Sequence, residues 1–170
     1  CYGITWAQEL LSNPGFELSF TGELPPGWQK FSNTDLTAIS VGPESETDSN
    51  KVLTINDRFN NVGYGLRSMT FPAQPGQVYQ ASVSMRSVNG GTGTLYIDFT
   101  NDKGARVSSK TVTSNSPEWK TVSVTHEAPP DTVWVSIILY SQSTHVGQIS
   151  FDDASLKPVS ADAWRGSDVE

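Results

Sequence analysis

Short segments in which apolar and polar residues alternate fill most of the sequence. Residues 81–86, 95–100 and 121–125 each place an apolar side chain at every second position, which is the period of a strand with one buried face. Glycine and proline separate these segments from further predicted strands at residues 36–41, 52–56, 64–71, 133–140 and 148–156. The pattern predicts an all-β fold, a two-sheet antiparallel β-sandwich of the jelly-roll type.

The loops between these segments contain residues that accept a positive φ. Asn89-Gly90-Gly91 lies between the first two alternating segments, and residues 101–104 (Asn-Asp-Lys-Gly) follow the second. They predict an antiparallel meander of consecutive strands. We expect one sandwich domain over residues 12–158, preceded by an N-terminal extension at 1–11 with weak helical character and followed by a linker or tail at 159–170.

Charge and composition narrow the possible partners. The 170 residues carry 11 basic and 18 acidic side chains, a net charge of −7, which disfavours nucleic acid and favours an uncharged ligand. The longest nearly apolar run, 133–140, is too short to span a bilayer. The chain has a single cysteine, Cys1, so an intrachain disulfide is excluded. Cys1 is either a lipid-modified first residue or, favoured about two to one, an ordinary cysteine at a processing boundary.

Motifs for catalysis are weak in this sequence. There is no Gly-x-Ser-x-Gly nucleophile motif, and neither of the two histidines has a supporting motif. Asp98 could serve a glycosidase, but no second carboxylate is identifiable beside it. Asp152 and Asp153 are adjacent in a strand, so their side chains point to opposite faces. We therefore expect a binding function, with a jelly-roll lyase or hydrolase as the enzymatic alternative.

Several aromatic residues are out of phase with the aliphatic residues of their own strands. Tyr96, Trp134 and Tyr140 alternate with the aliphatic side chains and therefore share the opposite face with polar residues. Aromatic rings suit the C–H face of a sugar, and amides, carboxylates and guanidinium groups suit its hydroxyls. The polar candidates for this face are Asn56, Arg86, Asp98 and Gln142. The alternative is that these rings pack under a loop or against a neighbouring domain, as in an adhesion or structural protein.

Acidic residues near the two ends of the chain are candidates for a metal site. Glu17 follows the segment Asn13-Pro14-Gly15-Phe16, and Asp152 and Asp153 belong to the last predicted strand. These carboxylates would meet if the first and last strands pair. Together with the polar loop 44–50 they would offer the oxygen ligands that Ca²⁺ takes. Exposed carboxylates without a metal are the alternative.

The order of six segments resembles the β-sandwich carbohydrate-binding modules of families 4, 9, 16 and 22. The segments are LLSNPGFE, PPGW, KVLTI, QPGQVYQASVSMR, PEWKTVSVTHEAP and ISFDDASL, and the resemblance covers Leu10 to Pro158. It implies a non-catalytic module with a ligand groove on one sheet and stacking aromatics at Trp28 and Tyr140; the alternative for Trp28 is a side chain that covers the core. It also implies a structural Ca²⁺ held by Glu17 and Asp152, with Asp153 as the substitute and the carbonyl of Gly15 completing the shell.

Together these observations predict a protein that binds a neutral polysaccharide or oligosaccharide without cleaving it. The resemblance implies a monomeric module, secreted or attached to the cell surface and linked to a catalytic domain that it brings to its substrate. The expected ligand-binding residues are Trp28, Asn56, Arg86, Tyr96, Asp98, Trp134, Tyr140 and Gln142.

Overall fold

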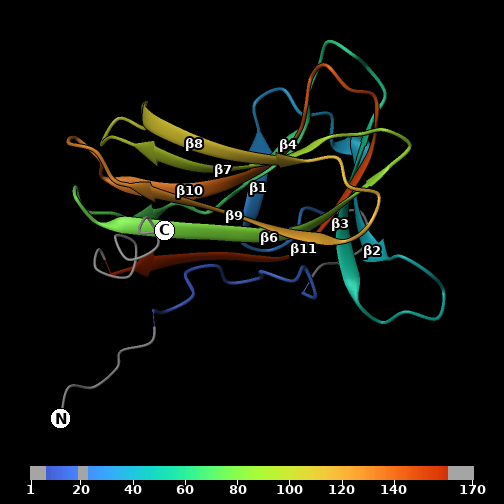
Figure 1. Cartoon of the computed structure of the whole chain (residues 1–170), viewed down its shortest axis with the longest axis horizontal. Helices are drawn as coiled ribbons and strands as arrows, with labels where there is room; N and C mark the ends of the chain where they lie inside the picture. The colour runs from blue at the N-terminus through green and yellow to red at the C-terminus, as the bar shows by residue number, and fades with distance from the viewer. Residues whose placement is uncertain (1–6, 19–22, 161–170) are drawn as a thin grey trace, which may run out of the picture.

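Two antiparallel sheets stack face to face in the computed structural model, which describes residues 7–18 and 23–160 (Figure 1). Sheet A contains, in spatial order, β1 (Trp28–Phe31), β4 (Gly65–Ser68), β10 (Trp134–Ser141), β7 (Gly93–Thr100) and β8 (Arg106–Ser114), and the short β5 (Phe71–Pro72) also pairs with β10. Sheet B contains β2 (Ile39–Pro43), β3 (Lys51–Asp57), β11 (Gly147–Val159), β6 (Val78–Val88) and β9 (Lys120–Glu127). The predicted all-β, two-sheet sandwich is confirmed.

The core lies between the sheets and is built from every second residue of each strand. β10 contributes Val135, Ile137 and Leu139, and β7 contributes Leu95, Ile97 and Phe99, all fully buried. Sheet B faces them with a matching set that includes Ile55, Val83, Phe151 and Leu156. Each of these side chains contributes about 1.5–3 kcal/mol through burial. The alternation in the sequence therefore fixes which face of each strand points outward.

The predicted meander is only half right. β7 and β8 form a hairpin as expected, and Asn101 Oδ1 accepts hydrogen bonds from the amides of Lys103 and Ala105 in its loop, at 3.0 Å each. β6 and β7, however, lie in different sheets. The turn at Asn89 and Gly90, with φ of 58° and 86°, carries the chain from sheet B to sheet A. The same turn residues serve a hairpin and a crossover, so they do not reveal which one forms.

Residues near the N-terminus extend sheet B beside β11. β3 pairs with the first part of β11, and further along that strand the amide of Leu10 donates to Leu156 O and the amide of Ala154 donates to Pro14 O. Leu11 is buried, and residues 7–11 are not helical. The sandwich thus includes residues before position 12, where the boundary was expected. The tail was expected at 159–170, but Val159 is the last residue of β11; Trp6 and residues 161–170 lie outside the described residues.

The helical content of the described part of the chain is one 3₁₀ turn, η1 (Leu36–Ala38), capped by the Asp35 side chain. Across residues 7–18 and 23–160 no helix has the length and apolar character needed to cross a membrane.

Candidate functional site

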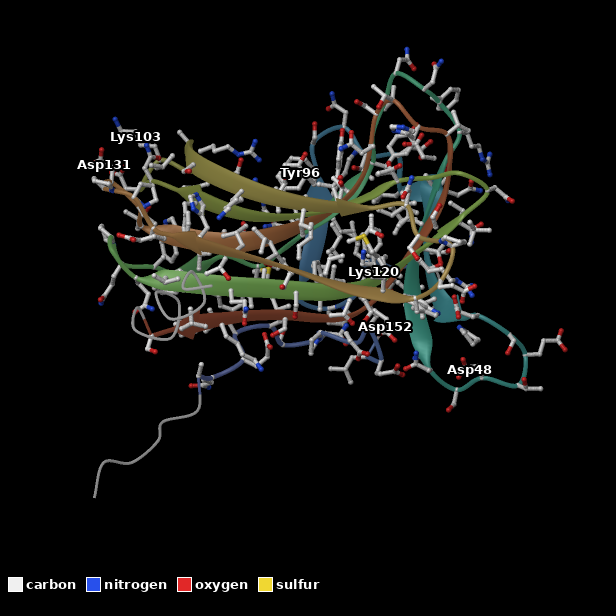
Figure 2. The ribbon with its side chains drawn as sticks, viewed as in Figure 1. Asp48, Tyr96, Lys103, Lys120, Asp131 and Asp152 are labelled. Atoms are coloured by element: carbon white, nitrogen blue, oxygen red, sulfur yellow. The ribbon has the colours of Figure 1, made fainter. Side chains whose placement is uncertain are left out.

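Aromatic side chains gather on the outer face of sheet A, the face turned away from sheet B. The strand register puts Phe31, Gly65 and Tyr140 in one row across β1, β4 and β10. In the next row Arg67 lies beside Ile138, which is opposite Tyr96 of β7. Figure 2 labels Tyr96 above the upper sheet. The three rings expected on this face, at positions 96, 134 and 140, all lie there and are partly exposed.

The rings form an edge-to-face series. Phe31 and Tyr140 have ring centroids 5.8 Å apart at 87°, and Tyr140 and Tyr96 are 6.2 Å apart at 85°. Burial raises the pKa of the Tyr140 hydroxyl, and the nearby Tyr96 and Asp57 add to the shift. Trp134 is at the other end of the face, six residues or about 20 Å along β10 from Tyr140. The rings therefore extend over a length greater than one sugar ring.

A glycine in β4 allows this strand to lie close to Tyr140 of β10. A Cβ on Gly65 would lie 2.5 Å from the carbonyl oxygen of Leu139 and 2.9 Å from Tyr140 Cδ2. No side chain fits in that space. Gly65 therefore lets the β4 backbone pass close under the Tyr140 ring.

Asp98 lies at the centre of the face and is fully buried. Arg67 Nη2 donates to its Oδ2 at 2.6 Å, and Arg106 Nε donates to its Oδ1. The Arg67 guanidinium also lies 5.1 Å from the centre of the Phe31 ring. Asp98 was expected to bind sugar hydroxyls directly. Its oxygens are occupied by the two arginines instead, so the guanidinium groups are the polar atoms that a ligand would meet.

Several polar atoms of this face lack partners. Arg67 Nε, Ser136 Oγ and Thr94 Oγ1 are buried and make no hydrogen bond with the part of the chain that the structure describes. An unpaired buried polar atom costs about 1–3 kcal/mol. The face thus has more hydrogen-bonding capacity than its own side chains use. We call the set Phe31, Arg67, Tyr96, Asp98, Trp134 and Tyr140 the aromatic face.

Two loops stand at the Tyr140 end of the aromatic face. The loops at residues 58–63 and 142–146 rise above the level of β7 and β8 (Figure 1). Their bases are joined, because Ser141 Oγ donates to Asp57 Oδ2 at 2.6 Å and accepts from the Tyr64 amide at 2.9 Å. Phe59 in the first loop is 54% exposed. Gln142 begins the second loop, where its backbone N–H donates to the carbonyl oxygen of Thr92.

Three expected ligand-binding residues lie elsewhere. Trp28 is 5% exposed, packs on Phe16 at a centroid distance of 5.2 Å and donates its indole N–H to Asn13 O. It is a core residue, so no ring face is free for stacking. Arg86 and Asn56 belong to β6 and β3 and lie on the outer face of sheet B. They cannot join the aromatic face because the whole sandwich separates the two surfaces.

The sequence analysis missed Phe31, Arg67 and Arg106. Arg67 is out of phase with the buried Leu66 and Ser68, so the alternation of β4 contained this signal. Phe31 follows Trp28 by three residues, which puts it on the opposite face of β1. What the sequence lacked was the strand order that brings β1 and β4 beside β10.

The expected metal ligands do lie near one another, at the junction of β3, β11 and the N-terminal segment. A Cβ on Gly15 would be 3.7 Å from Asp152 Oδ1 and 3.8 Å from Glu17 Cγ. Asp152 accepts hydrogen bonds from Asn50 Nδ2 and from the Asp153 amide, both at 2.7 Å. Figure 2 shows Asp152 on the lower sheet, and Asp48 on the adjoining loop. Asp153 itself is exposed, with a φ of 48° at a β-bulge.

The electrostatics of this cluster suit a cation. Burial raises the pKa of Asp152, and the charges of Asp153 and Glu17 raise it further, against the hydrogen bonds from Asn50 and Asp153. Glu17 Oε1 accepts from the Lys51 amide at 2.9 Å. No three His, Cys, Asp or Glu side chains of the described residues converge as a metal-binding group. The residues present therefore fit a hard cation only if backbone carbonyls, such as that of Gly15, complete the shell.

A comparison with protein families matches residues 8–145 to the family CBM_4_9, described as carbohydrate binding domain. The chain belongs to this family. This carbohydrate-binding domain has no match among curated protein sequences.

Solved structures of related shape support the same fold. The carbohydrate-binding domain superposes on TmCBM61, solved with β-1,4-galactotriose, with a TM-score of 0.59 and 18% identity, covering 89% of this chain and 99% of that one. For the enzymatically active domain of the bacteriophage CBA120 tailspike protein 4, the TM-score is 0.66 at 16% identity, with 89% of this chain and 21% of that one covered. For the Clostridium thermocellum xylanase 10B CBM22-1-GH10 modules with xylohexaose, the TM-score is 0.60 at 15% identity, and the match covers 92% of this chain and 29% of that one. The domain thus spans about a fifth and a third of the two larger proteins.

Proposed function

We propose that this carbohydrate-binding domain binds a neutral glycan chain along the aromatic face, without cleaving it. The observation that carries the proposal is the continuous series Phe31, Tyr140 and Tyr96 beside the Arg67–Asp98–Arg106 cluster. The rings offer flat apolar surface to the C–H faces of sugars, and the guanidinium N–H groups donate to their hydroxyls. The loops at residues 58–63 and 142–146 form one wall of the groove.

The length of the aromatic face favours a chain over a single sugar. Tyr140 and Trp134 lie at opposite ends of β10, about 20 Å apart, with the arginine cluster between them. A glycan lying along β10 would contact rings at both ends and guanidinium groups at its middle. Asp98 offsets one of the two arginine charges, which leaves the face without the strong positive charge that would select an acidic glycan.

The decisive experiment removes one ring. We expect Tyr140→Ala to weaken binding at least tenfold, about 1.4 kcal/mol, because the ring is the middle member of the series. Binding is measured by calorimetry with β-1,4-linked gluco-, xylo-, manno- and galacto-oligosaccharides and with β-1,3-gluco-oligosaccharides. The matched control, Tyr140→Phe, keeps the ring and should bind within a few fold of the wild type.

Two results would count against the proposal. Unchanged affinity for every oligosaccharide in Tyr140→Ala, in a variant whose unfolding midpoint is also unchanged, would remove the aromatic face as the site. Release of reducing ends from any member of the panel during long incubation would favour the enzymatic alternative.

The domain's setting is part of the same proposal. The xylanase 10B structure joins a domain of this shape to a GH10 module, which supports a linked catalytic domain here. A secreted or surface-attached, monomeric module would raise the concentration of that enzyme at its substrate. A Ca²⁺ ion held by Asp152, Glu17 and nearby carbonyl oxygens would tie the N-terminal segment to β3 and β11, and would supply positive charge to the buried carboxylate.

A further inference from the structure

The outer face of sheet B holds a polar cavity that the aromatic face does not use. Its volume is about 300 Å³, and its lining includes Ser40, Thr54, Asn56, Arg86, Gln148 and Ser150. The register explains the grouping, because Ser40, Thr54, Ser150 and Arg86 lie directly opposite one another on β2, β3, β11 and β6. We call this cavity the sheet B hollow.

An exposed tryptophan is held rigidly beside the sheet B hollow. Arg86 Nη2 donates to Glu44 Oε1 at 2.7 Å, and its guanidinium carbon lies 5.5 Å from the centre of the Trp119 ring. The Trp119 indole N–H donates to the other oxygen of Glu44 at 3.2 Å. Trp119 is nevertheless 37% exposed. The three side chains brace one another, which lowers the entropy that a ligand must overcome to use the indole.

The chemistry of the lining favours an uncharged polyhydroxylated ligand. Glu44 neutralises Arg86, so the site has no net charge to select an acid. Asn56 and Gln148 each provide an amide donor and acceptor, and the hydroxyls of Thr54 and Ser150 lie 3.3 Å apart. Arg86 Nε is buried without a hydrogen-bond partner among the described residues.

We propose that the sheet B hollow is a second saccharide-binding site, sized for one or two sugar units. Its volume is at the lower end of small-molecule sites, about 300–1,000 Å³. The inference rests on the proposed function for the class of ligand only, since the residues and the sheet are different. Two sites on opposite faces allow one domain to hold two glycan chains, or two parts of one chain, at once.

Each proposed site has its own tryptophan, which makes the two sites separately observable. The test uses the full chain with its five tryptophans replaced by 5-fluorotryptophan, and follows the ¹⁹F resonances of Trp119 and Trp134, assigned with Trp→Phe variants. The probes are glucose, galactose, mannose, xylose and their β-1,4-linked disaccharides. We expect at least one probe to shift the Trp119 resonance saturably, and equally so in Tyr140→Ala.

The variant Gln148→Ala should weaken that response about fivefold, since one amide hydrogen bond is lost. Gln80→Ala removes an exposed amide from β6, on the outer face of sheet B but away from the hollow, and should leave the response unchanged. A Trp119 resonance that no probe moves, or that stops responding in Tyr140→Ala, overturns the second site. A Trp119 response that persists in Tyr140→Ala, with a Trp134 resonance that stays silent even with the longer oligosaccharides of the calorimetry panel, would instead contradict the aromatic face and uphold the sheet B hollow.

Discussion

The outer faces of the two sheets hold similar side chains in different electrostatic settings. On sheet A the carboxylate of Asp98 is fully buried and lies between two guanidinium groups. On sheet B the Glu44–Arg86 pair is nearer to solvent, with side chains 22% and 33% exposed. Asp152, on the same side as that pair, is buried, and among the described residues it accepts hydrogen bonds only from the Asn50 side-chain amide and the Asp153 backbone N–H.

These settings give the two faces different roles. The sheet A cluster fixes the positions of Arg67, which lies against the Phe31 ring, and of Arg106, so its ion pairs are structural and also set the polar edge of the proposed groove. The sheet B pair contacts Trp119 at the edge of the sheet B hollow. Burial raises the pKa of Asp152, and no basic side chain of the described residues forms an ion pair with it, so this carboxylate is the one that a bound cation would stabilise.

The largest difference in stability between the two faces should follow from removing one carboxylate charge on each of them. Asp98→Asn leaves two guanidinium groups without their counter-charge, and breaking a buried pair costs about 3–5 kcal/mol. Because both arginines are partly exposed, we expect the lower end, about 3 kcal/mol. Glu44→Gln, the matched change on sheet B, should cost about 1 kcal/mol or less. Urea unfolding, with equal slopes for both variants, measures the two losses. Equal losses would contradict the distinction between the faces.

A smaller difference in stability should follow from adding one methyl group to each sheet by a glycine-to-alanine substitution. Gly65→Ala on sheet A puts a Cβ against Leu139 O and the Tyr140 ring, which should cost about 2 kcal/mol by overpacking and weaken glycan binding by displacing the ring. Gly42→Ala in β2 meets no atom within 4 Å. It should be neutral or gain about 0.5 kcal/mol, because glycine weakens a strand. A loss of stability without a loss of affinity in Gly65→Ala would mean that Tyr140 is not a ligand contact.

The two faces also show how far a sequence determines a site. Alternation correctly separated Tyr96, Trp134 and Tyr140 from the aliphatic core, because the period of a strand is local information. It could not assign Arg86 to sheet B, because a strand with one buried face fits either sheet of a sandwich. Trp28 follows a Pro-Pro-Gly turn that suits a loop, and only tertiary packing against Phe16 makes it a core residue. Glu17 does lie near Asp152, but the expected pairing of the first and last strands is wrong: β1 pairs with β4 in sheet A, and an irregular segment before β1 lies beside β11 instead.

The smallest expected effect tests Asp152, a carboxylate with no cationic partner among residues 7–18 and 23–160. Its folded pKa is raised, so the ionised form is disfavoured by folding: at neutral pH its charge lowers stability, and protonation as the pH falls towards its pKa relieves that cost. Bound Ca²⁺ would relieve the same cost at neutral pH. At free Ca²⁺ ten times the dissociation constant, the gain is about 1.4 kcal/mol, a rise in Tm of about 3–6 °C.

Asp152→Asn separates this explanation from a purely structural role. In chelator the variant should unfold at or above the wild-type Tm, since it no longer buries a charge, and added Ca²⁺ should leave its Tm unchanged. Mg²⁺ at the same concentration is the ionic-strength control. Asp48→Asn, on the exposed loop beside the site, should retain the Ca²⁺ response. If wild-type Tm is insensitive to Ca²⁺ and chelator alike, the buried carboxylate has no metal partner. The Asn50 amide and the Asp153 backbone N–H, which donate to its two oxygens, are then its only partners within the described part of the chain.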